Sequence, residues 1–239
     1  MSWVNEGVTS AGVTERDFEL LVKGHAVPGV CWEPEEGAQG LVLLGHGGTT
    51  HKRIDYIVEV ARQLCSQGIA AMAIDGPGHG DRASSDLTAH PKAFAEAWRS
   101  AGGTETVIAD WRAALDFVEA EVGPRATGWW GLSMGTMMGL PVCATDERVR
   151  VALLGLMGTW GPNVEELIDL APKLKCPVRF LVQWDDEIVP REACIELFTM
   201  VGSDKKTLHG NPGKHQDVPA FEIAASVAYL ADGLKRTRN

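Results

Sequence analysis

From about residue 40 onward, short apolar runs alternate with longer amphipathic stretches. This alternation is the feature that most restricts the folds that the chain can adopt. Leu41 to Leu44 and Ile69 to Ile74 are continuously apolar, as expected of parallel strands buried on both faces. Between them, Ile54 to Gln67 carries apolar residues at helical spacing, and Gly68 follows as a C-cap. Alternating strands and helices predict a mostly parallel sheet with helices on both faces.

The same alternation continues to the C-terminus. Further strands are predicted at residues 126–130, 149–157, 178–184 and 205–208, and further helices at 104–122, 136–144, 191–201 and 218–235. Upstream, residues 17–22 and 26–32 predict an antiparallel pair that covers one edge. The sum is about eight strands in a single domain spanning residues 1–239, a length that α/β architectures reach as one unit. Residues 84–103 are predicted to form a small flap, and residues 158–175 are too few for a large lid.

Charge and cysteine content exclude several classes of protein. The chain has 22 Lys and Arg against 32 Asp and Glu, a formal charge of −10, which disfavours nucleic acid and anionic lipid as partners. No apolar stretch approaches the ~18 residues of a membrane span, and no signal peptide is evident at the N-terminus. The five cysteines are scattered and odd in number, which favours reduced, mostly buried thiols in a cytoplasmic protein. A catalytic role for one of them is the less favoured interpretation.

The pentapeptide Gly131-Leu132-Ser133-Met134-Gly135 stands between a predicted strand and a helix-like run. A Gly-x-Ser-x-Gly at such a junction forces the serine onto a tight, strained turn, where side chains at the glycine positions would collide with neighbouring elements. The Ser133 hydroxyl would then project above the sheet edge, within reach of a base. Ser133 is therefore the candidate nucleophile.

A serine nucleophile needs a base, and the base needs a carboxylate that fixes its tautomer. Downstream of Ser133 the histidines are His209 and His215. His215 is favoured because it lies in a loop that can carry the imidazole over the sheet edge, whereas His209 lies at the end of a strand. The acid is expected in the segment that follows the strand at 178–184, where Asp186 is preferred and Asp185 is the alternative.

These motifs together resemble those of the α/β-hydrolase fold superfamily, and most closely its small dienelactone-hydrolase-like and esterase-like members. Leu44-Gly45-His46-Gly47-Gly48 is similar to the family's segment after its third strand, and Asp75-Gly76-Pro77-Gly78-His79-Gly80 to the one after its fourth. Ser133, the segment from Asp186 to Pro190, and Gly213-Lys214-His215 fill the nucleophile, acid and base positions. Dienelactone hydrolases proper carry cysteine at the elbow, so Ser133 favours ordinary ester chemistry.

The resemblance implies an oxyanion hole made by the backbone N–H of Met134 and one N–H from the loop after Gly47, with Gly48 the first choice and Thr49 the second. It implies a serine hydrolase that cleaves small or medium carboxylic esters through an acyl-enzyme, without a cofactor. Thioesterase, lactonase or other acyl-hydrolase chemistry on the same triad is the alternative. A non-catalytic binding protein on this scaffold is the alternative from another class. The sequence leaves the oligomeric state open.

The remaining histidines are not expected to take part in catalysis or to bind a metal ion. His46 and His79 precede the nucleophile and are expected to make hydrogen bonds that structure their loops. His25, His51 and His90 show no metal-ligand spacing, and the sequence has no Cys cluster, so no metal site is expected.

Overall fold

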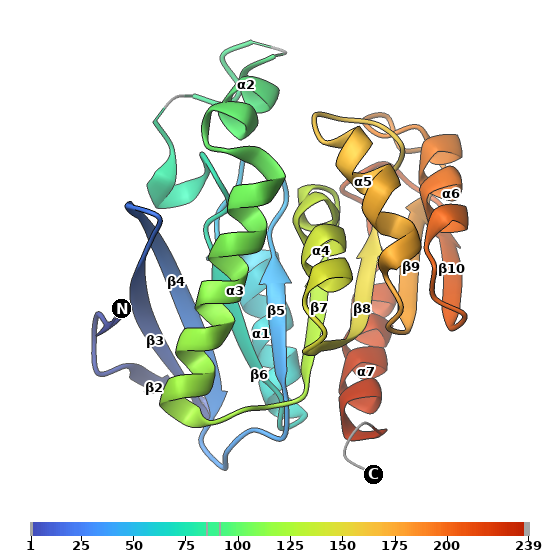
Figure 1. The fold of residues 1–239 in the computed structure, drawn as a ribbon. Helices are drawn as coiled ribbons and strands as arrows, with labels where there is room; N and C mark the ends of the chain where they lie inside the picture. The colour runs from blue at the N-terminus through green and yellow to red at the C-terminus, as the bar shows by residue number, and fades with distance from the viewer. Residues whose placement is uncertain (1, 85, 91, 237–239) are drawn as a thin grey trace.

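The computed structural model describes residues 2–84, 86–90 and 92–236. Within these ranges ten strands form one sheet in the order β1-β3-β4-β6-β5-β7-β8-β9-β10, with β2 paired to β3 (Figure 1). The strands are β1 (Ser2–Trp3), β2 (Val8–Ser10), β3 (Val13–Val22), β4 (His25–Pro34), β5 (Leu41–Gly45), β6 (Ala70–Ile74), β7 (Thr127–Gly131), β8 (Val149–Gly155), β9 (Val178–Gln183) and β10 (Lys206–Asn211).

The sheet is parallel from β6 to β10 and antiparallel at its N-terminal edge. β5 pairs in parallel with β6 and β7, and the parallel pairing continues through β8 and β9 to β10. β4 joins β6 antiparallel, and β3 pairs antiparallel with β4 over its full length. Every parallel strand from β5 to β9 is buried along most of its length, which explains its continuously apolar sequence.

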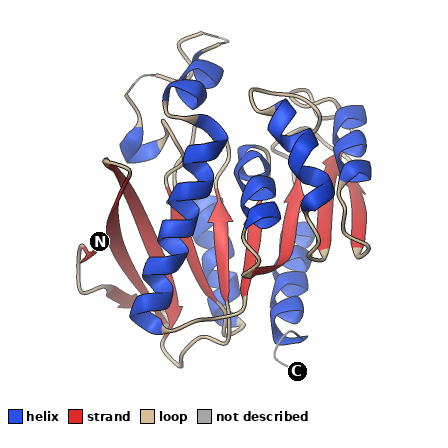
Figure 2. Cartoon of the chain, viewed as in Figure 1, coloured by secondary structure: helices blue, strands red, loops and turns tan. Residues whose placement is uncertain are grey.

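Helices cover both faces of this sheet (Figure 2). α3, α4, α5 and α6 lie on the face toward the viewer and α1 and α7 on the far face, while α2 stands above the upper edge (Figure 1). The helices are α1 (Asp55–Ser66), α2 (Ala93–Ser100), α3 (Gly103–Val122), α4 (Met134–Thr145), α5 (Val164–Leu170), α6 (Arg191–Met200) and α7 (Ala220–Arg236), with short 3-10 turns at Gly80–Arg82 and Ala171–Lys173.

The alternation of side chains along β7 divides the core into two halves. Trp129 packs with the apolar cluster under α3 and α4, and Trp130 with the cluster under α1 and α7. Both indoles are buried, and both N–H groups are satisfied, by Gly135 O at 3.1 Å and by Ser226 Oγ at 3.0 Å. Because successive side chains of a strand point to opposite faces, these two neighbouring tryptophans pack the central strand against helices on both faces.

The predicted α/β fold is confirmed, with differences at its margins. The antiparallel pair is longer than expected, and β1 and β2 add two strands beyond the predicted eight. These two strands are two and three residues long, too short to produce a periodic pattern. The connection at residues 158–175 contains α5, and the stretch at residues 84–103 contains α2. Residues 85 and 91 of that stretch lie outside the described residues, and the flap and the single-domain boundary stay predictions.

None of the helices in the described ranges combines the length and the apolar character needed to cross a bilayer.

Candidate active site

Ser133 occupies the turn between β7 and α4 in a backbone conformation that non-glycine residues rarely adopt. Its φ is 58° and its ψ is −120°. Such a residue costs on the order of 1–3 kcal/mol and persists only where its surroundings hold it. A Cβ on Gly135 would stand 2.3 Å from Gly45 O, and one on Gly131 would stand 2.6 Å from Gly135 O. Both glycines of the motif are therefore required by close backbone approach.

Hydrogen bonds from β8 hold this turn in place. The N–H of Ser133 donates to Gly155 O at 2.9 Å. The Thr136 hydroxyl lies 2.7 Å from the same oxygen, and it accepts the N–H of Gly155 at 2.8 Å. The strained turn is thus fastened to the neighbouring strand as well as to its own helix.

The structure brings His215 to Ser133. The two residues are 82 positions apart in the sequence, and His215 Nε2 lies 2.9 Å from Ser133 Oγ. His215 belongs to the loop between β10 and α7, and its side chain is buried. With Nδ1 protonated, Nε2 is free to accept the proton of the serine hydroxyl.

Asp186 completes the chain of contacts from the loop after β9. Its Oδ2 lies 2.8 Å from His215 Nδ1, and its carboxylate is almost fully buried. Its Oδ1 accepts the N–H groups of Ile188 and Val189, both at 2.8 Å. One oxygen is thus fixed by the backbone while the other points at the imidazole. The arrangement can hold His215 in the tautomer that accepts a proton from Ser133.

The two alternative residues lie elsewhere. Asp185 is exposed, and its Oδ2 accepts the N–H of Gly213 at 3.2 Å, so it contacts the histidine loop rather than the imidazole. The ring of His209 lies within β10, with Nε2 3.0 Å from Thr207 Oγ1. Asp186 and His215, the preferred residues, are the ones that the structure places beside Ser133.

Three backbone N–H groups near the elbow are open. Met134 is the first residue of α4, where N–H groups lack intrahelical partners and the helix dipole is positive. Gly48 lies in the loop after β5, the strand beside β7. The N–H of Gly47 is engaged by the Tyr56 hydroxyl at 2.6 Å. In the described part of the chain, the N–H groups of Met134, Gly48 and Thr49, the alternative donor, meet no protein acceptor.

The model of the Alpha/beta hydrolase family matches residues 41–233, which is most of the chain. The chain belongs to the alpha/beta hydrolase family. A comparison with curated proteins found no match.

Solved structures place this hydrolase near esterases. A PEG-bound cold-adapted esterase from an Arctic intertidal metagenomic library is 58% identical, with a TM-score of 0.93, and the match covers 98% of this chain and 100% of that one. The native structure of such an esterase is 54% identical, with the same coverage and a TM-score of 0.87. The acetyl xylan esterase from Paenibacillus sp. R4 is 20% identical over 98% of this chain and 88% of that one, with a TM-score of 0.74. At that identity the likeness shows the fold alone.

The two histidines of the hydrolase's loop motifs are buried and bonded to loop backbone. His46 Nδ1 lies 2.8 Å from Gly47 O, and its Nε2 accepts the N–H of Gly76 at 2.9 Å. This pair of contacts requires the neutral Nδ1–H tautomer. Burial lowers the pKa of His46 to about 4, which keeps it neutral at pH 7. His79 Nδ1 contacts Pro77 O at 2.9 Å, and burial lowers its pKa too.

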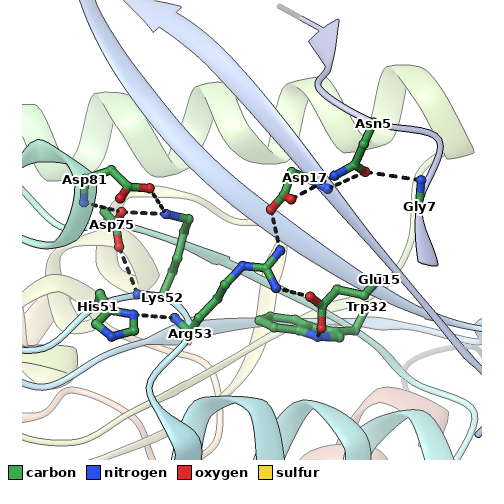
Figure 3. Close-up of polar contacts among 10 residues, drawn as sticks. All are labelled: Asn5, Gly7, Glu15, Asp17, Trp32, His51, Lys52, Arg53, Asp75 and Asp81. Carbon is green, nitrogen blue, oxygen red and sulfur yellow. Dashed lines mark hydrogen bonds and ion pairs between the residues drawn. The ribbon is translucent and has the colours of Figure 1, made fainter. Parts of the chain in front are cut away.

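A buried ion pair joins the loops after β5 and β6 (Figure 3). Lys52 Nζ lies 2.7 Å from Asp75 and 2.6 Å from Asp81, and its backbone N–H donates to Asp75 at 2.9 Å. Burial alone lowers the pKa of Lys52, but these carboxylates raise it overall. The neighbouring Arg53 pairs with Glu15 and Asp17 on β3 (Figure 3).

Sequence reasoning missed several residues that shape the site. Gln183 is buried at the end of β9, and its amide donates to Lys214 O at 3.1 Å, next to His215. Glu187 accepts the N–H of His215 at 3.0 Å, a contact that lowers the pKa of Glu187. A polar residue at the end of an apolar strand was the available signal for Gln183. Lys52 gave none, because its partner Asp75 is 23 residues away.

The described residues contain no group of His, Cys, Asp and Glu arranged to hold a metal ion. The five cysteines are unpaired thiols, and four of them are buried. Burial raises the pKa of Cys65, Cys176 and Cys194 to about 12, so these thiols are not activated nucleophiles.

Proposed function

We propose that the protein is a serine hydrolase that cleaves carboxylic esters, with Ser133 as nucleophile, His215 as base and Asp186 as its orienting acid. The observation that carries the proposal is the continuous contact from Asp186 through His215 to Ser133, at 2.8 and 2.9 Å. Such a series converts an unreactive hydroxyl into a nucleophile. The 58% identical esterase, whose whole length this chain covers, supports ester hydrolysis as the reaction.

In the proposed mechanism, Ser133 Oγ attacks the ester carbonyl while His215 Nε2 takes the hydroxyl proton. Asp186 stabilises the imidazolium that forms. The carbonyl oxygen becomes an oxyanion bound by the N–H groups of Met134 and Gly48, an interaction that strengthens as charge develops. His215 then protonates the departing alcohol, which leaves an acyl-enzyme. Water attacks this ester, His215 takes the water's proton, and the proton returns to Ser133 as the acid is released.

We further propose small or medium esters as substrates and a cytoplasmic location, with no cofactor and no nucleic-acid or membrane partner. Short connections around the site favour small esters over long-chain lipids. The unpaired cysteines support a reducing compartment. Thioesters and lactones are the alternative substrates, since the same residues serve any acyl transfer. A binding protein is the weaker alternative, because binding alone does not require three residues in hydrogen-bonded series.

The first test is active-site labelling. A fluorophosphonate probe should label the wild-type protein, and Ser133→Ala should abolish both labelling and hydrolysis of p-nitrophenyl esters. Circular dichroism and the thermal midpoint would show that the variant is folded. A panel of p-nitrophenyl esters of increasing acyl length, run beside thioesters and lactones, then ranks the substrate classes. Undiminished labelling of Ser133→Ala would remove it as the nucleophile.

A further inference from the structure

Side chains hydrogen-bond to three consecutive peptide groups of the loop after β5. The Thr50 hydroxyl donates to Gly47 O at 2.8 Å, and His46 Nδ1 reaches the same oxygen at 2.8 Å. On the other side of Gly47, its N–H donates to the Tyr56 hydroxyl at 2.6 Å. One residue further on, the Thr49 hydroxyl donates to Gly48 O at 2.6 Å. Two adjacent threonines therefore hold two adjacent peptide groups.

Because a peptide group is planar, a threonine that holds its carbonyl oxygen also orients the N–H of the same group. In a trans peptide the C=O and the following N–H point in opposite directions from one rigid plane. Gly47 O and the N–H of Gly48 belong to the same plane, so fixing the carbonyl against Thr50 and His46 fixes the direction of the Gly48 N–H. Gly48 O, which Thr49 holds, shares its plane with the N–H of Thr49 instead.

The loop needs such support because it is intrinsically free. Gly47 and Gly48 have no Cβ to restrict them, and Thr49 has a φ of 61°, in the left-handed region. An oxyanion donor contributes to rate only if it is aimed beforehand at the place where charge develops. Side-chain hydrogen bonds to the loop carbonyls supply the orientation that two successive glycines cannot supply themselves.

We propose that Thr50 is a positioning residue for ester hydrolysis, which acts through Gly47 O to aim the Gly48 N–H at the oxyanion. This inference rests on the proposed function. Gly48 is the second oxyanion donor in this proposal, and Thr49, whose N–H shares its peptide plane with Gly48 O, is the alternative that the test distinguishes.

The test compares the two threonines with p-nitrophenyl acetate as substrate. Thr50→Val keeps the shape of the side chain and removes the hydroxyl, and it should lower kcat/KM about tenfold or more, short of the ~10²–10³ lost when a donor is removed outright. Thr50→Ser restores the hydroxyl and should return kcat/KM to within about threefold of wild type. Thr49→Val removes the neighbouring hydroxyl and tests the alternative donor, and with Gly48 as the donor its loss of kcat/KM should be smaller than that of Thr50→Val.

Two inhibitors distinguish the orientation of the Gly48 N–H toward an oxyanion from the binding of a neutral ligand. A short-chain trifluoromethyl ketone forms a tetrahedral adduct with an oxyanion, so its Ki should rise in Thr50→Val by the same factor as kcat/KM falls. The methyl ketone of the same chain length, which stays a neutral ground-state ligand, should bind both proteins equally. Thermal midpoints check folding, and Thr50→Ala replaces Thr50→Val if the valine variant is unfolded.

Several results would overturn the inference. The first is a Thr50→Val enzyme as fast as wild type, and the second is a Thr50→Ser enzyme as slow as Thr50→Val. The third is a Thr50→Val enzyme whose affinity for the two ketones falls by the same factor. A loss in Thr49→Val alone would move the donor to Thr49. Failure of the proposed function is a different result, since wild type and Ser133→Ala would then be equally inactive toward esters.

Discussion

At the scale of single residues, the site depends on side chains that satisfy two partners at once. Asp186 accepts backbone N–H groups with one oxygen and faces His215 Nδ1 with the other. His46 accepts from Gly76 with Nε2 and faces Gly47 O with Nδ1. Each therefore has a fixed orientation and a fixed protonation pattern. A substitution that preserves shape but changes the donor and acceptor pattern should be more damaging than its size suggests.

Asp186→Asn tests this expectation for the acid. The amide is isosteric, yet it can present an N–H to His215 and no longer stabilises the imidazolium. We expect kcat for p-nitrophenyl acetate to fall by about 10⁴-fold. Asp185→Asn is the matched control, because its amide oxygen can still accept the N–H of Gly213, and its kcat should stay within about tenfold of wild type. Near-normal turnover by Asp186→Asn would transfer the role to Asp185.

The sequence predicted the three residues of the proposed triad better than the side chains that surround them. Ser133, Asp186 and His215 each follow a strand, and parallel strands bring their carboxyl ends to one edge, so their meeting was predictable, although order along the chain alone left Asp185 and His209 as alternatives. Thr50, Lys52 and Gln183 act through contacts with backbone or with residues distant in sequence. Such contacts depend on how the loops fold over the sheet edge, and no periodic pattern records that. The roles assigned to the reactive residues stay predictions until they are measured.

At the scale of elements, α2 stands over the loop that carries Gly48. A Cβ on Gly48 would meet the ring of Phe94 at 3.2 Å, and the same ring packs edge-on against His79, with centroids 5.5 Å apart. Trp98 of the same helix is fully buried. One end of α2 is thus anchored in the core while Phe94 faces the loop. This arrangement was not evident from sequence, where residues 84–103 indicated only a flap.

Phe94→Ala should therefore widen the space beside the oxyanion loop. We expect the ratio of kcat/KM for p-nitrophenyl octanoate to that for p-nitrophenyl acetate to rise about threefold or more, since each accommodated methylene contributes up to about 0.8 kcal/mol. Phe221→Ala is the control, because that aromatic residue is already exposed on α7. An unchanged ratio in Phe94→Ala would show that α2 does not border the acyl group.

At the scale of the whole molecule, buried neutral histidines connect stability to pH. The pKa of His46 is lowered to about 4 by burial, and that of His79 is lowered by the same cause. In the unfolded chain both titrate near the ordinary value of about 6.5. Between these values the unfolded state binds more protons than the folded state. The free energy of unfolding must therefore rise with pH across this window and fall as pH drops through it.

For His46 the difference corresponds to about 3 kcal/mol lost between pH 7 and pH 4, at about 1.4 kcal/mol per pKa unit. Urea unfolding at pH 7, 6, 5 and 4 measures this loss. His46→Asn should unfold at lower urea at pH 7 and show a shallower decline toward pH 4, while the exposed His90→Asn should follow the wild-type profile. Parallel profiles for wild type and His46→Asn would contradict the assignment.

The pairing of Arg53 with Glu15 and Asp17 bears on how this molecule could be dissected. The segment that defines the family begins at residue 41, yet the outer antiparallel ribbon upstream of it holds the stem of the loop that carries Gly48. A fragment that begins at residue 41 would keep Ser133, Asp186 and His215 but would lose Glu15 and Asp17, the ion-pair partners of Arg53. The N-terminal strands therefore help to hold the loop after β5, and shortening them should disturb the backbone around Gly48.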